Sequence, residues 1–227
     1  MLNGAIGDFL PAALAVALSP IPIIAVVLVL GTPRARSNGP LFALGWVTGL
    51  SAVSVLVVAL LGGLGADDAG GGPSTLVSLL RIAGGVLLLV LAGQQWSKRP
   101  KKGEDPEMPG WMATIDSFTP GKSLLFGAAL SGANPKNLIL TLAASASIAQ
   151  AELAVRGTVI AVAVFVLIGS ATVVGAVLFS LIAGERAAGP LTGLKTFMVA
   201  NSAVIMMIVL LVLGAKVLGD GIAGFRG

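Results

Sequence analysis

Long stretches with few or no charged residues dominate the hydrophobic pattern of this chain. Six such stretches follow one another, at residues 9–33, 37–66, 76–96, 122–150, 157–183 and 196–215. A helix that crosses a bilayer needs about 20 predominantly apolar residues, and each stretch supplies roughly that number. Arg81 interrupts the third stretch and Lys136 the fourth. The pattern predicts an all-α polytopic membrane protein with six transmembrane helices.

A polar segment at residues 97–119 separates the first three stretches from the last three. It combines charges of both signs with prolines, a composition that favours an exposed loop. We therefore divide the chain into a three-helix repeat at 1–96, a charged cytoplasmic loop at 97–119 and a second three-helix repeat at 120–227. Because each repeat has an odd number of spans, the two would be inverted relative to each other, as in many secondary transporters.

The distribution of Lys and Arg predicts the orientation. Loops rich in these residues face the cytoplasm. With the N-terminus outside, the cytoplasmic loops hold most of the 14 basic residues, namely Arg34, Arg36, Lys98, Arg99, Lys101, Lys102, Lys122, Arg186 and Lys195. The segment between the second and third spans carries Asp67 and Asp68 and fits the outer side. We expect both termini to lie outside.

Composition narrows the functional classes. Of 227 residues, 56% are hydrophobic and 11% charged, with a mean hydropathy of +1.00, whereas soluble domains are near 25% charged. This excludes a soluble enzyme and a nucleic-acid-binding module, and the net charge of +4 is no evidence for a nucleic-acid partner. The absence of cysteine and histidine removes thiol chemistry and the commonest metal ligand. We expect no cofactor, no metal and no Walker-type ATP site.

Proline motifs interrupt the first and fourth stretches at similar depths. The first contains Ser19-Pro20-Ile21-Pro22 and the fourth contains Asn134-Pro135-Lys136. Each motif lies about 18–20 Å from the start of its helix at 1.5 Å per residue. A proline inside a helix removes a backbone donor and clashes with the preceding turn, and in a membrane such a break must face protein or a cavity. A simple kink is the alternative, but we predict that helices 1 and 4 are broken.

Lys136 is the most informative charge. A lysine at the bilayer centre costs about 2.5–3.5 kcal/mol on insertion scales. At the N-terminus of a half-helix its charge would add to the helix dipole and free amides, which favours an anion. The alternative is a shifted helix from which Lys136 reaches an interface. Polar residues that could complete a substrate site are Ser19, Ser131, Asn134, Asn137, Thr141 and Asn201, although Asn201 suits helix-to-helix bonding better.

The Ser-Pro-x-Pro and Asn-Pro-Lys motifs, together with the six-span layout and the central loop, resemble the LysE superfamily of bacterial exporters. Within it, the whole chain is most similar to the actinobacterial glycopeptidolipid- or sulfolipid-addressing proteins. The resemblance implies an exporter in the bacterial plasma membrane that forms a homodimer, with a site between broken helices 1 and 4. The residues that carry over are Ser19, Pro20, Pro22, Asn134, Pro135 and Lys136. Unlike cation exporters, this chain has no acidic or histidine residue deep in a span.

These observations favour a secondary exporter or flippase for an anionic or zwitterionic lipid, lipid precursor or small metabolite. Membrane lipids and a second copy are the other expected partners, and Gly45 and Gly49 form a small-xxx-small motif that suits packing within the chain or in a dimer. Three alternatives remain: an accessory protein for envelope lipid export, a LysE-type amino-acid exporter, and an intramembrane enzyme with Ser19 or Ser131 and Lys136 as base. We expect no enzymatic activity. Lys136 is the main candidate for any proton coupling.

Overall fold

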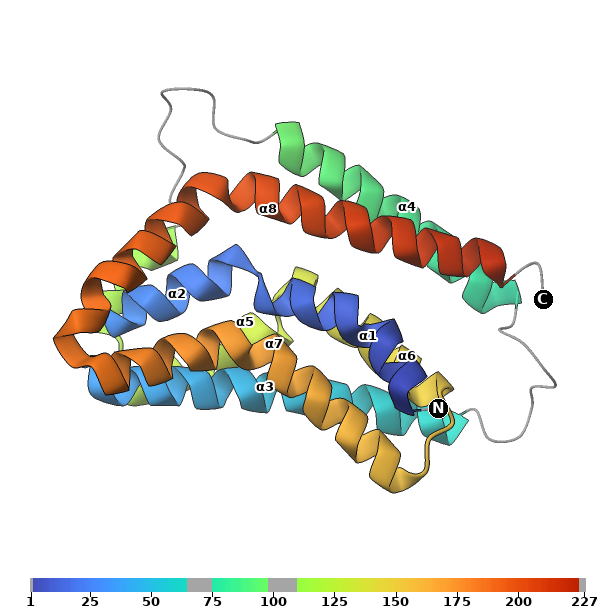
Figure 1. Cartoon of the computed structure of the whole chain (residues 1–227), viewed down its shortest axis with the longest axis horizontal. Helices are drawn as coiled ribbons and strands as arrows, with labels where there is room; N and C mark the ends of the chain where they lie inside the picture. The colour runs from blue at the N-terminus through green and yellow to red at the C-terminus, as the bar shows by residue number, and fades with distance from the viewer. Residues whose placement is uncertain (1, 65–74, 98–109, 225–227) are drawn as a thin grey trace. The chain divides into compact units, whose positions relative to one another are not determined.

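The computed structural model describes residues 2–64, 75–97 and 110–224, and these ranges contain helices and turns but no strand. The α-helices and short 3₁₀ helices (η) follow one another along the chain (Figure 1): α1 (Leu2–Ala17), α2 (Pro20–Leu30), α3 (Ala35–Leu64), α4 (Thr75–Ser97), η1 (Gly110–Ser117), α5 (Pro120–Gly132), α6 (Pro135–Gln150), α7 (Val155–Ala183), η2 (Gly184–Ala187) and α8 (Ala188–Ala223). The all-helical prediction is confirmed for these ranges.

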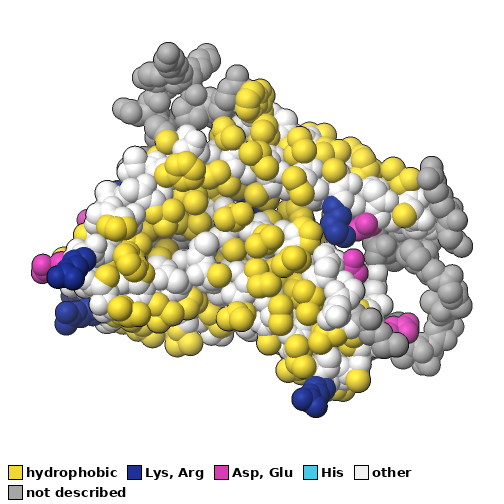
Figure 2. Space-filling model, in the orientation of Figure 1, with side chains coloured by type: hydrophobic (Ala, Val, Ile, Leu, Met, Phe, Trp, Pro, Cys, Tyr) yellow, Lys and Arg dark blue, Asp and Glu magenta, His cyan; other side chains and the backbone are white. Residues whose placement is uncertain are grey.

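Several helices have the length and hydropathy of membrane spans. Residues Ala35–Leu61 and Val155–Ala223 each qualify, and α1 with α2 forms a further candidate span that is bent by 46° at its break. On the face shown in Figure 2, hydrophobic side chains are widespread and charged groups are confined to a few places. Large apolar residues such as Val155, Leu167 and Ile182 are strongly exposed, as expected where the solvent is lipid. These features are typical of a membrane protein, and six spans remain a prediction.

The chain forms two compact units, each built from two separate segments. The first comprises Met1–Gly62 and Pro106–Ala200, and the second comprises Gly63–Asp105 and Asn201–Gly227. Neither unit coincides with a sequence half, so the division into repeats at 1–96 and 120–227 also remains a prediction. The predicted loop at 97–119 lies partly outside the described residues. Residues Gly110–Ser117 form η1 instead, because Ile115 is buried and the 3₁₀ turn packs against α2.

In the first unit, α1 lies at the centre and packs against both α6 and α7. Its buried face is rich in alanine, which lets neighbouring helices approach closely. Phe9 of α1 meets Phe165 of α7 edge to face, with ring centroids 5.9 Å apart. The second broken helix is therefore held beside the first through α1 and α6.

Helices α3 and α5 touch backbone to backbone. A Cβ added at Gly45 would collide with the carbonyl of Leu124, and one added at Gly127 would collide with the carbonyl of Phe42. Gly49 likewise lies against Ser131. The small-residue motif at Gly45 and Gly49 thus serves packing inside the chain.

The second unit pairs α4 with the C-terminal part of α8. A Cβ at Gly85 would collide with the backbone of Leu218, and one at Gly214 would crowd the side chain of Leu89. Lys216 and Asp220 form an ion pair of 2.8 Å on the exposed surface of α8. Glycines again set the distance between the two helices.

Candidate functional site

Two helix breaks lie where the prolines predict them. Helix α1 ends at Ala17 and α2 begins at Pro20, while α5 ends at Gly132 and α6 begins at Pro135. Ser19 and Asn134 are the N-cap residues of the new helices, with extended backbones at φ −65°, ψ 117° and φ −68°, ψ 120°. Proline is well tolerated at the first helical position, where its missing N–H would have had no partner. The breaks are therefore helix ends and new starts, and the prediction of broken helices is confirmed.

The new helix starts offer fewer free amides than we expected from the sequence. Pro20 and Pro22 both lack an N–H in the first turn of α2. At the start of α6, Pro135 also lacks one, the Lys136 N–H donates to the Asn134 side chain at 3.1 Å, and the Leu138 N–H donates to the Asn134 carbonyl at 2.8 Å. Any attraction for an anion at this site must therefore come chiefly from the Lys136 side chain.

The Lys136 ammonium reaches across to the first broken helix. Its Nζ donates to the backbone carbonyl of Ala15 at 3.0 Å and to Oγ of Ser19 at 2.6 Å. Ala15 lies in the last turn of α1, where the negative end of the helix dipole attracts a cation. Among the residues that the structure describes, Lys216 and Asp220 form an ion pair, whereas the contacts of Lys136 are to neutral groups. Its charge is thus hydrogen-bonded without a neighbouring carboxylate.

Asn137, the next residue, joins the two breaks to each other. Its side chain is fully buried, Nδ2 donates to the carbonyl of Leu130 at 2.9 Å, and Oδ1 accepts from the Ser19 hydroxyl at 3.0 Å. Leu130 belongs to the last turn of α5. Thr141 donates to the Asn137 carbonyl at 2.8 Å, one turn along α6. Lys136 and Asn137 together therefore bind the C-terminal ends of both α1 and α5.

The last turn of α1 has a hydrogen bond for each of its terminal carbonyls. The Leu14 carbonyl accepts from the Leu18 N–H at 2.9 Å, and the Val16 carbonyl accepts from the Ser19 N–H at 3.2 Å. The Lys136 ammonium donates to the Ala15 carbonyl, and the Thr172 hydroxyl of α7 donates to the Ala17 carbonyl at 2.6 Å. A helix end away from water needs such partners. The break is thus stabilised by side chains from two other helices.

Some predicted residues take other positions. Ser131 donates to the Ala128 carbonyl of its own helix at 3.1 Å and lies against Gly49. Pro135 is exposed, and Pro20 and Pro22 are buried in the first turn of α2. Asn201 belongs to the second unit, whereas residues of the first unit make the whole network described above. These positions make Ser131 a packing residue.

Thr172 is the residue that the sequence analysis missed. It lies in an apolar span, and its hydroxyl bonds a carbonyl of another helix. A polar residue inside an uncharged stretch was the available signal, but its partner is a backbone atom 155 residues earlier in the chain. Side-chain types do not reveal that kind of contact.

Comparison with known proteins gives one clear relationship. The chain matches the family model described as "Sap, sulfolipid-1-addressing protein" over residues 9–223, which is nearly its whole length. No curated protein and no solved structure matches it. The match includes both helix breaks, and so the chain belongs to the sulfolipid-1-addressing protein (Sap) family.

Proposed function

We propose that this protein moves an anionic lipid or lipid precursor across the plasma membrane as a secondary exporter or flippase. The observation that carries the proposal is the Lys136 ammonium, whose hydrogen-bond partners among the described residues are neutral oxygen atoms of the first broken helix. Membership of a sulfolipid-addressing family supports a lipid with an acidic headgroup. Substrate sites of secondary transporters are typically formed by discontinuous helices.

An anionic headgroup would compete with the present partners of Lys136. An anionic oxygen adds the Coulomb attraction between two opposite charges to the hydrogen bond, which the neutral oxygens of Ala15 and Ser19 cannot supply. A sulfate, phosphate or carboxylate that takes Lys136 would release the Ala15 carbonyl and the Ser19 hydroxyl. The end of α1 would then lose one of its links to α6. Substrate binding would in this way change the contact between the two broken helices.

The short contact between Ser19 and Lys136 also suits a serine nucleophile with a lysine base. Acyl transfer additionally needs N–H donors for the developing oxyanion. Pro20 and Pro22 remove such donors from the first turn that follows Ser19, and the Ser19 side chain is buried. Transport therefore fits this arrangement better than catalysis.

Reconstitution into vesicles tests the proposal. The purified protein, in vesicles containing a fluorescently labelled anionic phospholipid, should accelerate loss of inner-leaflet fluorescence to an impermeant quencher. Lys136→Met should abolish the acceleration, because the variant keeps the length of the side chain without its charge. Lys122→Met is the matched control, since Lys122 is exposed at the start of α5, and it should behave like the wild type.

Two results would contradict transport of lipid by this protein alone. Equal rates for the wild type, Lys136→Met and empty vesicles would favour an accessory role beside another exporter. Acceleration that persists in Lys136→Met would show that Lys136 is not needed for lipid movement. Counterflow of labelled amino acids into the same vesicles separates a LysE-type amino-acid exporter from a lipid transporter.

A further inference from the structure

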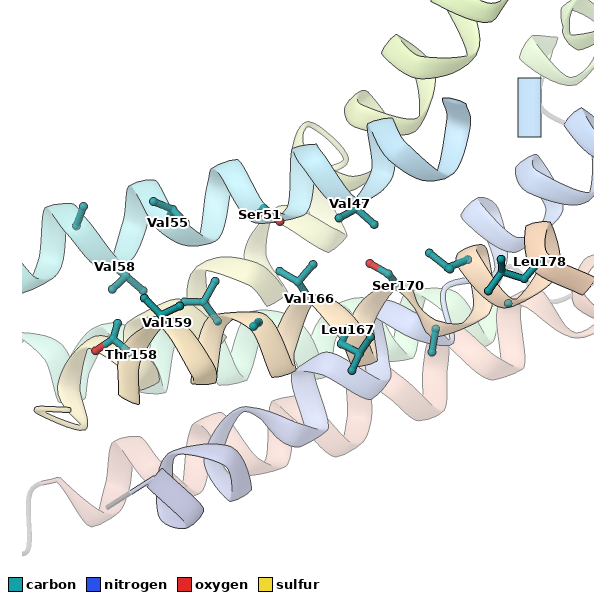
Figure 3. A pocket seen from close by; sticks show the side chains of 16 residues that line it. Val47, Ser51, Val55, Val58, Thr158, Val159, Val166, Leu167, Ser170 and Leu178 are labelled. Carbon is teal, nitrogen blue, oxygen red and sulfur yellow. The ribbon is translucent and has the colours of Figure 1, made fainter. Parts of the chain in front are cut away.

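An elongated apolar cavity runs between α3 and α7 of the first unit (Figure 3). Its volume is about 890 Å³, and its walls are mostly valine, alanine and leucine side chains, with three hydroxyl residues, Ser51, Thr158 and Ser170. Ligand cavities in proteins commonly have volumes of about 300–1,000 Å³. The space is therefore large enough for a substantial part of a lipid molecule.

The dimensions of the cavity match an extended hydrocarbon chain. Its α3 wall runs from Val47 to Ala59 and its α7 wall from Thr158 to Leu178. At 1.5 Å per residue these walls are about 18 Å and 30 Å long. The hydrocarbon core of a bilayer is about 30 Å thick, so one leaflet accounts for about half of that. An acyl chain of one leaflet would fit along the shorter wall.

The rim of the cavity is open and apolar. Val55 on α3 is 57% exposed, and Val159 and Leu167 on α7 are 62% and 74% exposed. Side chains of this kind are stable at a surface that faces lipid tails. A chain could enter the cavity sideways from the bilayer without crossing polar side chains.

One buried hydroxyl in the cavity has no partner. Ser170 is 3% exposed, and its Oγ makes no hydrogen bond to any residue that the structure describes. A serine inside a helix often donates to the carbonyl four residues earlier, as Ser54 does to Leu50 at 2.8 Å. In Figure 3 the Ser170 oxygen points into the space between α7 and α3. A buried hydroxyl without a partner is unfavourable, and an acceptor supplied by a bound molecule would satisfy it.

The cavity and the Lys136 network lie against different faces of α7. Gly169 lies between Leu50 of α3 and Val16 of α1, and Thr172 binds the Ala17 carbonyl. Ser170 and Val166 line the cavity instead. Occupancy of the cavity can therefore be measured separately from events at Lys136.

We propose that the cavity between α3 and α7 binds one acyl chain of an ester lipid, with the ester carbonyl accepting a hydrogen bond from Ser170. The inference rests on the proposed function in that it takes a lipid as the substrate class. It adds the place where the tail is held. The apolar lining supplies the affinity for the chain, and the Ser170 hydroxyl fixes its depth.

Photolabelling tests the proposal. The full-length protein in nanodiscs would be irradiated with an ester phospholipid that carries a photoreactive group in one acyl chain, and the labelled peptides identified by mass spectrometry. Labels should concentrate on residues 47–59 and 158–178. Ala163→Phe, which puts a ring into the cavity, should reduce them severalfold. Ala143→Phe is the matched control on an exposed position of α6 outside the cavity and should leave them unchanged.

The hydroxyl is tested by Ser170→Ala and by an ether analogue of the same lipid. Loss of one neutral hydrogen bond should weaken labelling by the ester lipid roughly fivefold. The ether analogue, which has no carbonyl, should label wild type and Ser170→Ala equally. Equal labelling by ester and ether lipids in the wild type would overturn the role of Ser170.

Labels spread evenly over all exposed apolar helices would overturn the site, as would crosslinks between two protein copies through α3 and α7. Neither result depends on Lys136. If Lys136→Met stops lipid movement while Ala163→Phe changes nothing, the cavity proposal fails and the proposed function stands. If labelling behaves as expected but no lipid moves, the cavity proposal stands and the proposed function fails.

Discussion

The contacts of Lys136 show how a single cation can be accommodated among apolar helices. Its charge is placed at the C-terminal end of α1, where a carbonyl needs a donor and the helix dipole favours a cation. The sequence predicted an anion as the partner of Lys136. It could not predict a backbone carbonyl as the partner, because every residue carries one. Lys136 therefore has a structural role, through its hydrogen bonds to Ala15 and Ser19, as well as the proposed role in substrate binding.

Thr172 offers a direct measure of what the α1 end contributes to stability. Thr172→Val keeps the shape of the side chain but leaves the Ala17 carbonyl without its donor. We expect the free energy of unfolding to fall by about 1–2 kcal/mol, measured as a lower melting temperature in detergent. Thr196→Val is the control, because Thr196 is exposed and bonds a carbonyl of its own helix. Equal shifts for the two variants would show that the α1 end does not depend on Thr172.

The helix breaks were the feature of the fold most accessible from the sequence. Pro20 and Pro135 each remove a backbone donor and clash with the preceding turn, and each follows a polar residue that is the N-cap of the new helix. Proline alone is not sufficient, since Pro11 and Pro40 lie inside α1 and α3. The 3₁₀ helix η1 was missed because Ile115 is buried by tertiary packing inside a segment that is polar on average. The link from Asn137 to Leu130 and Ser19 was also inaccessible, since it depends on how α5, α6 and α1 meet.

The close packing of α3 and α5 should be sensitive to a single methyl group. Gly127→Ala places a Cβ against the carbonyl of Phe42, and the two backbones must separate to admit it. We expect a loss of about 1–3 kcal/mol in stability. Gly193→Ala in α8 is the matched change, because a Cβ there meets no atom within 4 Å, and alanine is the better helix former by roughly 0.5–1 kcal/mol. Thermal unfolding measures both variants. Equal melting temperatures for Gly127→Ala and Gly193→Ala would contradict the close backbone contact between α3 and α5.

At the scale of the molecule, the two units draw corresponding parts from both sequence halves. The first unit contains α1 to most of α3 together with α5 to α7, and the second contains α4 and the end of α8. An inverted repeat of three spans would distribute its helices in this way. The six-span topology that such a repeat requires is still a prediction, and it determines on which side each loop lies.

The natural absence of cysteine makes that topology measurable with single introduced thiols. Ser37→Cys near the start of α3, Ala188→Cys at the start of α8 and Ala154→Cys before α7 each replace a small exposed residue. With six spans and the N-terminus outside, an impermeant maleimide should label Ala154→Cys in intact cells. Ser37→Cys and Ala188→Cys should react only after the membrane is opened, because they follow the first and fifth spans. The cysteine-free parent gives the background.

Labelling of Ala154→Cys from the same side as Ser37→Cys would mean that α5 and α6 together return to the side they entered from. The second broken helix would then be a re-entrant loop, and the inverted repeat would have to be abandoned.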